Sequence, residues 1–276
     1  MAWHARLQLD YLFEQQRSVA RHTHSGPLRI LQSLYPEGDA VCHNVLVHPP
    51  GGLVGGDRLD LEVSVGPGAH GLITTPGATR FYRSAGELAL QNTNLRVASG
   101  GRLEWLPAEA LCYNDCRAEN HIVFDLAPGA ELIGWDVTAL GLPNANQPFD
   151  SGQIVQHLEM PGTWLERGRI DAADQRLMTS PLGLNGHKCL ASMFFLAGSP
   201  LERHRRQQAL DLVREIIEAS TLKDTVGATS PNPQVVVVRA LAPLVEPAMQ
   251  VMQQVWKAWR AHFWRLPAVK PRIWAM

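Results

Sequence analysis

The sequence has few of the features that mark secreted, membrane-spanning or nucleic-acid-binding chains. Its N-terminal stretch, MAWHARLQLDYLFEQQR, contains no apolar core of a signal peptide, and no run of about 18 apolar residues occurs anywhere. The 25 basic and 26 acidic residues leave a formal net charge of −1, so the composition offers no electrostatic footprint for nucleic acid or for an anionic membrane. We therefore expect a cytoplasmic protein that binds neither.

Cysteine is scarce, and the four thiols do not form a metal-binding pattern. Cys112 and Cys116 form a C-x₃-C pair with no second pair downstream, which is a poor signal for zinc. His22 and His24 would place both rings on one face of a strand, but no third ligand accompanies them. We expect free thiols in a reducing compartment. A transient metal site at the two histidines is the alternative.

The chain also lacks the common catalytic and nucleotide-binding motifs. No G-x-S-x-G motif occurs, and the glycine-rich loop HPPGGLVGGD (48–57) matches a P-loop only in its glycine spacing from Gly51 to Gly56. Asp57 and Arg58 stand where a P-loop needs Lys and then Ser or Thr. The loop also precedes an alternating strand pattern, whereas a P-loop opens a helix. We therefore expect no nucleotide in this loop.

Short strands dominate the first two-thirds of the sequence. In DRLDLEVSV (57–65), leucine and valine alternate with polar residues, which is the period of a half-buried strand. Similar segments follow at 70–75, 102–107, 121–126, 131–137 and 153–160, with Gly, Pro or Asn between them.

Three strand–turn–strand segments resemble one another, at 61–77, 94–109 and 122–137. Gly68, Gly101 and Gly129 are expected to mark the equivalent point in each. Such repeats are typical of stacked coils that bury their apolar faces on one another. A plain β-sandwich, in which hairpins look alike by chance, is the alternative.

Helical spacing begins near residue 199. Ser199, Pro200 and Glu202 resemble a capping box ahead of a helix over 199–220, and apolar residues recur at helical steps over 244–266. An apolar strand at 234–241 separates the two. We therefore expect a mainly β, single-domain protein. Its layered, β-helix-like body of stacked short strands would span about 1–198, and two C-terminal α-helices would lie within about 199–276.

Asp57 is the most informative acid. It has the same parity as Leu59 and Leu61, so its carboxylate is expected on the core side of the strand, where an unpartnered charge is costly. It would either guide a cation or cap the glycine-rich turn through backbone amides. Arg80, beside Tyr82, is expected to be a buried structural partner of such an acid.

Longer motifs carry a resemblance to a known family. HPPGGLVGGD is followed by TTPGATRFYRS (74–84), LEWLPAE (103–109), SPLGLNG (180–186), VVVVRALA (235–242) and PRIW (271–274). In this order and over essentially the whole chain, these motifs resemble those of the urease accessory protein UreD/UreH family. The resemblance implies a non-enzymatic maturation factor for the nickel enzyme urease, with a layered β-rich fold and a small helical part. It implies apo-urease, a helical UreF-like protein and a UreG-like GTPase as partners. It also implies a nickel ion in transit, with no tightly bound cofactor.

The resemblance further implies an internal, water-filled passage for nickel. Because clustered imidazole and thiolate groups would hold Ni²⁺ tightly, scattered carboxylates and carbonyls suit transit better. We expect a route past Asp57, Glu109, Asp136 and Glu166, with Asp171 as a weaker candidate. Each could instead be a surface acid or a paired structural acid, and Asp136 lies on the opposite face from the heavier apolar set of its strand. Two rival functions stay open: a metal-dependent hydrolase, and a β-solenoid interaction module without a metal route.

Overall fold

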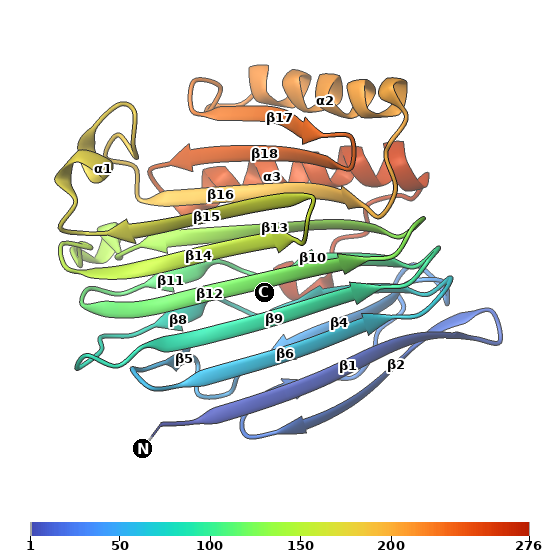
Figure 1. The fold of residues 1–276 in the computed structure, drawn as a ribbon, viewed down its shortest axis with the longest axis horizontal. Coiled ribbons are helices and arrows are strands. Elements are labelled where there is room, and N and C mark those ends of the chain that lie inside the picture. Colours follow the sequence, from blue (N-terminus) through green and yellow to red (C-terminus); the bar gives the residue numbers. More distant parts are fainter. Residues whose placement is uncertain (1, 276) are drawn as a thin grey trace.

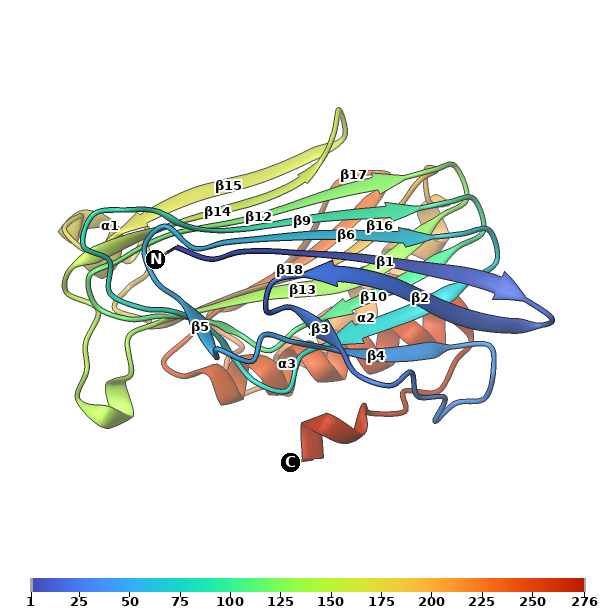
Figure 2. The same ribbon diagram turned by 90° about the horizontal axis from the view of Figure 1, so that it is seen from below.

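Two β-sheets packed face to face form the body of the protein (Figure 1, Figure 2). The computed structural model describes residues 2–275. Within that range the first sheet has seven strands, in the order β15 (Trp164–Asp171), β14 (Gly152–Met160), β12 (Cys116–Leu126), β9 (Ala89–Val97), β6 (Arg58–Val65), β1 (His4–Glu14) and β2 (Arg17–Ser25).

The second sheet has 11 strands in the described residues. Its main path is β17 (Val226–Asn232), β18 (Val235–Ala242), β16 (Cys189–Ala197), β13 (Glu131–Leu140), β10 (Arg102–Leu106), β7 (His70–Thr74), β4 (Cys42–Val47) and β3 (Arg29–Ile30). Beside this path lie the short strands β5 (Gly52–Leu53), β8 (Thr79–Phe81) and β11 (Ala110–Cys112).

The chain passes repeatedly from one sheet to the other, as the sequence repeats predicted. Strands β6, β9, β12 and β14 lie parallel in the first sheet, and β7, β10 and β13 lie parallel in the second. Each strand of the first set up to β12 is followed by a tight turn and then a strand of the other sheet. The layered, β-solenoid-like arrangement is therefore confirmed. Antiparallel strands flank these coils in both sheets.

The turns between the sheets need glycine at one position. They span 66–69, 98–101 and 127–130, and each is closed by a backbone hydrogen bond from its fourth residue to its first. Their third residues have positive φ: Gly68 at 74°, Gly100 at 72° and Gly129 at 81°. The prediction that Gly101 marks this point was wrong by one residue. Gly101 is small for another reason, because a Cβ there would approach the carbonyl oxygens of Gly66 and Ala98 at 3.0 Å.

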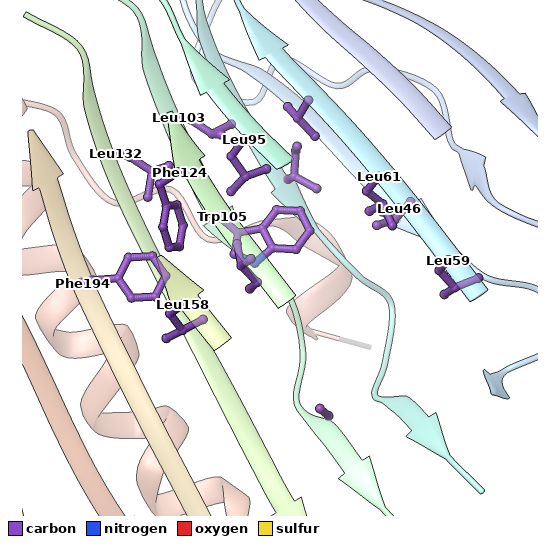
Figure 3. Packing of buried hydrophobic residues seen from close by; sticks show 14 of the residues in the cluster. Leu46, Leu59, Leu61, Leu95, Leu103, Trp105, Phe124, Leu132, Leu158 and Phe194 are labelled. Atoms are coloured by element: carbon purple, nitrogen blue, oxygen red, sulfur yellow. The ribbon is translucent and has the colours of Figure 1, made fainter. Parts of the chain in front are cut away.

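An apolar core fills the space between the sheets (Figure 3). On β6, Leu59 and Leu61 alternate with half-buried polar residues and point inward. Figure 3 shows Leu95, Trp105 and Phe194 converging on this core from strands of both sheets. Burying each such side chain contributes about 1.5–3 kcal/mol relative to an exposed one. The register of the strands is therefore fixed by which residues can face the core.

The helices cover the other face of the second sheet (Figure 2). Helices α2 (Arg203–Glu218) and α3 (Val245–Trp259) pack there, and α3 continues as a π-helical turn, η2 (Arg260–Trp264). Short helices α1 (Gln175–Thr179), η1 (Pro143–Ala145) and η3 (Arg272–Ala275) complete the described elements. Because β13 and β16 face the first sheet on one side and the helices on the other, both of their faces are buried.

Helix α2 begins later than its sequence predicts. Its N-cap is Glu202, with no side-chain capping hydrogen bond, so the expected capping box at Ser199 was wrong. Ser199 Oγ instead accepts a hydrogen bond of 3.1 Å from Gly129 N, in the turn of the third coil. The hydroxyl is used to fix that turn and is not available to the helix.

A buried ionic network attaches the helices to the second sheet. Arg260 is fully buried and lies 2.8 Å from Glu37 Oε2 and 3.2 Å from Glu104 Oε1. His70 Nε2 lies 2.8 Å from Glu104, and the Trp256 indole donates to the same carboxylate. Since a buried charge is tolerated only with partners, this network fixes where η2 sits.

The structure contains no membrane-crossing candidate among the helices of residues 2–275: each is too short or too polar to span a bilayer. The assignment of the whole chain to one domain stays a prediction.

Candidate functional site

A set of polar side chains interrupts the apolar core between the two sheets. All occupy positions whose strand parity directs them into the gap between the sheets. We call this set the interior polar cluster; its members are Gln91, Asn120, Asp136, Gln156, Glu166, Ser192 and Arg239.

The first-sheet part of the cluster is a ladder of amides. Gln91, Asn120 and Gln156 are successive Cα partners on β9, β12 and β14. Gln91 Nε2 donates to Asn120 Oδ1 at 3.4 Å. Asn120 Nδ2 donates in turn to Asp136 Oδ1 at 2.8 Å, across the gap to the second sheet. The three amides therefore form a polar row on a largely apolar face.

Asp136 is a buried carboxyl group with neutral hydrogen-bond partners. It is 4% exposed, and its two oxygens accept hydrogen bonds from Asn120 and from Gln156 Nε2. Burial raises the pKa of Asp136 to about 6, with a smaller contribution in the same direction from Glu166, while the two amides lower it. At neutral pH Asp136 is therefore an anion buried between the sheets. The opposite face of β13 packs on the helices, which is why Asp136, although opposite the heavier apolar set, is not on the surface.

Glu166 and Arg239 form the end of the cluster that reaches solvent. Ser192 Oγ donates to Glu166 Oε1 at 2.9 Å, and Arg239 Nε donates to Glu166 Oε2 at 2.9 Å. Ser192 is the Cα partner of both Asp136 and Arg239. One row of the second sheet thus connects the buried carboxyl to an exposed guanidinium.

The other end of the cluster opens into a cavity of about 260 Å³. Gln91 lines it together with Leu59 and Leu61 of β6, and His48, Thr75 and Arg80 lie at its wall. Burial lowers the pKa of His48, although the Asp57 charge opposes this shift. Polar groups therefore extend from this cavity, through the core, to Glu166 on the edge strand β15 and to the exposed Arg239.

The chemistry of the cluster suits weak, reversible contact with a divalent cation. Its donors are carboxylate, amide and hydroxyl oxygens, which hold first-row metals less tightly than imidazole or thiolate groups. Among the described residues, no three His, Cys, Asp or Glu side chains converge to enclose a metal ion. The described residues of the cluster are therefore not arranged as a site that would hold a metal ion tightly.

Asp57 caps the glycine-rich turn, one of the two roles expected for it. It is 8% exposed, and its oxygens accept hydrogen bonds from Trp3 N at 2.8 Å and from Val54 N at 3.0 Å. The Asp57 amide donates to the Val54 carbonyl, which closes the turn. Asp57 therefore joins the start of β1 to the loop before β6.

Arg80 is not the buried partner of Asp57, and that expectation was wrong. Its side chain is exposed, and it forms no ion pair with any carboxylate of residues 2–275. Asp57 needs no such partner because backbone amides already bind its oxygens. Tyr82 is half-buried, and its ring lies 4.9 Å from the ring of Tyr113, centre to centre.

Glu109 and Asp171 lie outside the cluster. Glu109 lines a larger cavity of about 630 Å³ beside Cys189 and Glu246. Burial, with Glu109 and Glu246, raises the pKa of Cys189 to about 12, so Cys189 is a neutral thiol there. Asp171 forms an ion pair with Arg169 and caps the turn at 171–173.

The thiols and the histidine pair show no shared metal geometry. The four cysteines are free and buried, as expected. The rings of His22 and His24 stack at 6.3 Å on an exposed edge strand, and His24 Nδ1 lies 3.0 Å from an Arg29 nitrogen.

Five members of the cluster were missed from the sequence: Gln91, Asn120, Gln156, Ser192 and Arg239. The available signal was parity, because each stands at a position where its strand otherwise carries core residues. Ser192, for example, lies between Leu190 and Phe194 on the inward face of β16. A single polar residue among apolar ones on a strand is easily taken to mark the end of the buried stretch.

Fold and site together define a layered, two-sheet β protein with a polar line through its interior. Residues 4–275 match the family model described as UreD urease accessory protein. The chain belongs to this family, which confirms the resemblance noted from its motifs.

Relatives match the chain over its full length. It is 66% identical over 275 residues to the urease accessory protein UreD of Variovorax paradoxus (strain S110), covering 100% of both chains. It is 67% identical over 276 residues to the UreD protein of Polaromonas sp. (strain JS666), again covering 100% of both. Identity to the UreD protein of Leptothrix cholodnii is 51% over 276 residues, covering 99% of each chain.

Proposed function

We propose that the protein is a non-catalytic factor of urease maturation. In this proposal it binds apo-urease in the cytoplasm together with a UreF-like helical protein and a UreG-like GTPase, and helps deliver nickel. Membership of the family supports the role in urease maturation, because full-length relatives carry the name urease accessory protein. Nickel is the cargo here, and no resident cofactor is required.

The interior polar cluster is, in this proposal, the path of the nickel ion. The observation that carries it is the burial of Asp136 with amide partners alone on its two oxygens. A charge buried in this way is costly, and a divalent cation beside it would offset that cost. Asn120 and Gln156 can rotate their amide groups, so that carbonyl oxygens face the cation in place of N–H donors.

The two ends of the cluster give the path an opening and an exit. Gln91 places one end in the 260 Å³ cavity. At the other end, Arg239 competes with a cation for Glu166, which favours release of the ion. Glu109 would lie on the outer approach, because its cavity shares Thr75 and Pro76 with the cavity at Gln91. Asp57 would act at the same end by holding the loop in place.

The test is to co-express the chain with apo-urease and the other accessory proteins. Asp136→Ala should co-purify normally with its partners but leave urease with little nickel and low activity. Asp125→Ala is the matched control, since Asp125 is an exposed acid on the outer face of β12, the strand that precedes β13 in the chain. Full activation by Asp136→Ala would exclude the path and favour an interaction module without a metal route. Failure of the wild-type chain to co-purify with apo-urease would contradict the maturation role itself.

A further inference from the structure

Two histidines lie side by side on the outer face of the first sheet, away from the interior polar cluster. His121 on β12 and His157 on β14 are Cα partners in neighbouring parallel strands. Their ring centres are 5.0 Å apart, with an angle of 33° between the ring planes. Their strand positions have the parity opposite to that of Asn120 and Gln156, so they face outward.

Each ring has a nitrogen atom without a hydrogen-bond partner. His157 Nε2 contacts Glu159 Oε2 at 2.8 Å, while His157 Nδ1 is shielded from solvent and unpartnered. His121 Nε2 is also shielded and makes no hydrogen bond, although Glu119 Oε2 lies 3.3 Å away. His157, held through Nε2 by a carboxylate with Nδ1 free, has the usual arrangement of a metal-binding histidine. In His121 the free nitrogen is the one beside the carboxylate.

The spacing of the rings matches that of two imidazoles on one ion. With metal–nitrogen distances of about 2.1 Å and an angle of about 90–110° at the metal, the ring centres would lie about 4.5–5.3 Å apart. The observed 5.0 Å falls within this range. Partial burial lowers the pKa of His121, with His157 and Arg167 acting in the same direction and Glu119 opposing them. This direction favours the neutral imidazole, the form that binds a metal.

We propose that His121 and His157 form a partly buried site, on the outer face of the first sheet, for one divalent transition-metal ion of borderline softness, Ni²⁺ or Zn²⁺. Water would complete the coordination. The nearby carboxylates of Glu119 and Glu159 offset the charge of the ion, whereas Arg167, the exposed Cα partner of His157, opposes it. Two protein ligands make this an exchangeable site, one that takes up an ion and gives it away. It is separate from the interior path and does not depend on it.

The experiment is Ni²⁺ binding to the purified full-length chain, followed by isothermal titration calorimetry. His121→Ala/His157→Ala should lose one ion per chain, or bind it at least about tenfold more weakly, since even loss of an outer-shell partner costs roughly 10–100-fold. His22→Ala/His24→Ala is the matched control, because it removes two neighbouring histidines from an exposed strand with rings 6.3 Å apart. It should leave this binding event unchanged.

Copper provides a second readout that counts the ligands. With Cu²⁺ as the probe, electron paramagnetic resonance should show coupling to two nitrogen nuclei in the wild type, and to one in each single variant. Thermal melts should show that the variants stay folded, since both histidines lie on the outer face of the sheet. An unchanged titration for His121→Ala/His157→Ala, or an equal loss in the His22→Ala/His24→Ala control, would overturn the site.

Discussion

Asn120 and Asp136 join the two sheets through a 2.8 Å hydrogen bond between a side-chain amide and a buried carboxyl group. Asn120 comes from β12 of the first sheet and Asp136 from β13 of the second, which directly follows it in the chain. A pair of apolar residues would pack there at less cost, because the folded protein must bury the Asp136 charge at neutral pH. The polar pair is therefore better explained by function than by stability.

Replacing Asp136 with Asn should make the protein more stable at neutral pH. The pKa rises from 3.8 to about 6 on folding, which corresponds to a destabilisation of about 3 kcal/mol above pH 6. Because the folded-state pKa is the higher one, this destabilisation is absent below the unfolded pKa, grows between the two pKa values and is complete above the folded pKa. Asn offers its oxygen to one of the two donating amides and its N–H group to the other, once that amide turns its own oxygen inward. Urea denaturation should show a gain of up to about 3 kcal/mol at pH 7.5 and about half of that at pH 5.

Asp125→Asn is the control for that measurement. Asp125 is exposed on the outer face of β12, so its replacement should change the unfolding free energy by less than about 0.5 kcal/mol at both pH values. An Asp136→Asn protein that is less stable than the wild type at pH 7.5 would mean that the carboxylate is stabilised by its surroundings. The conclusion that burial of the Asp136 charge destabilises the folded protein would then be wrong.

Removing the carboxylate of Asp57 should loosen the N-terminal strand. Asp57→Ala leaves the amides of Trp3 and Val54 without their acceptor. The free energy of unfolding should therefore fall by about 1–3 kcal/mol. Hydrogen exchange should rise in the peptides that contain these two amides. Asp57→Asn retains one acceptor oxygen and should lose less. If Asp57→Asn, although folded, still activates urease poorly, Asp57 also serves the nickel path; normal activation would restrict Asp57 to the turn.

The buried Arg260 should be among the most sensitive positions in the chain. Arg260→Met removes the cation between Glu37 and Glu104 and leaves two buried carboxylates without it. We expect the free energy of unfolding to fall by about 3–5 kcal/mol. Tryptophan fluorescence can follow the change, because Trp256 donates to Glu104. Arg214→Met, at an exposed ion pair of α2, should cost less than about 1 kcal/mol. Equal losses in the two variants would show that the network adds nothing beyond a surface pair.

The repeated body of the fold could be predicted from the sequence because its pattern is local. Alternation at 58–65 and the three glycine turns indicate strands that bury one face, and the structure has them in that arrangement. Structural details that depend on residues far apart in the chain could not be predicted from the sequence. The Ser199 hydroxyl caps the turn at Gly129, 70 positions away, so its local signal as a helix N-cap misled.

The candidate site was only partly visible in the sequence, for a related reason. Asp136 and Glu166 were named as acids on the expected nickel route, and both belong to the interior polar cluster. Nothing local connects them with Gln91 or Arg239, because that connection depends on sheet order and on register between strands far apart in the chain. Arg80 shows the opposite error: a basic residue beside aromatic ones suggested a buried pair, but Arg80 lies at the surface.

Arg239 should control how readily a cation leaves the interior polar cluster. Its ion pair with Glu166 is partly exposed, so Arg239→Ala should cost less than about 1 kcal/mol in stability. It would, however, free Glu166 to hold a divalent cation. We therefore expect the Arg239→Ala protein to co-purify with urease, to retain more nickel and to activate urease more slowly. Arg239→Lys keeps the charge and should behave nearly as the wild type does. Glu166→Gln should show slow activation without retained nickel. If Arg239→Ala and Glu166→Gln both load urease at the wild-type rate, nickel does not leave the protein at this end of the cluster.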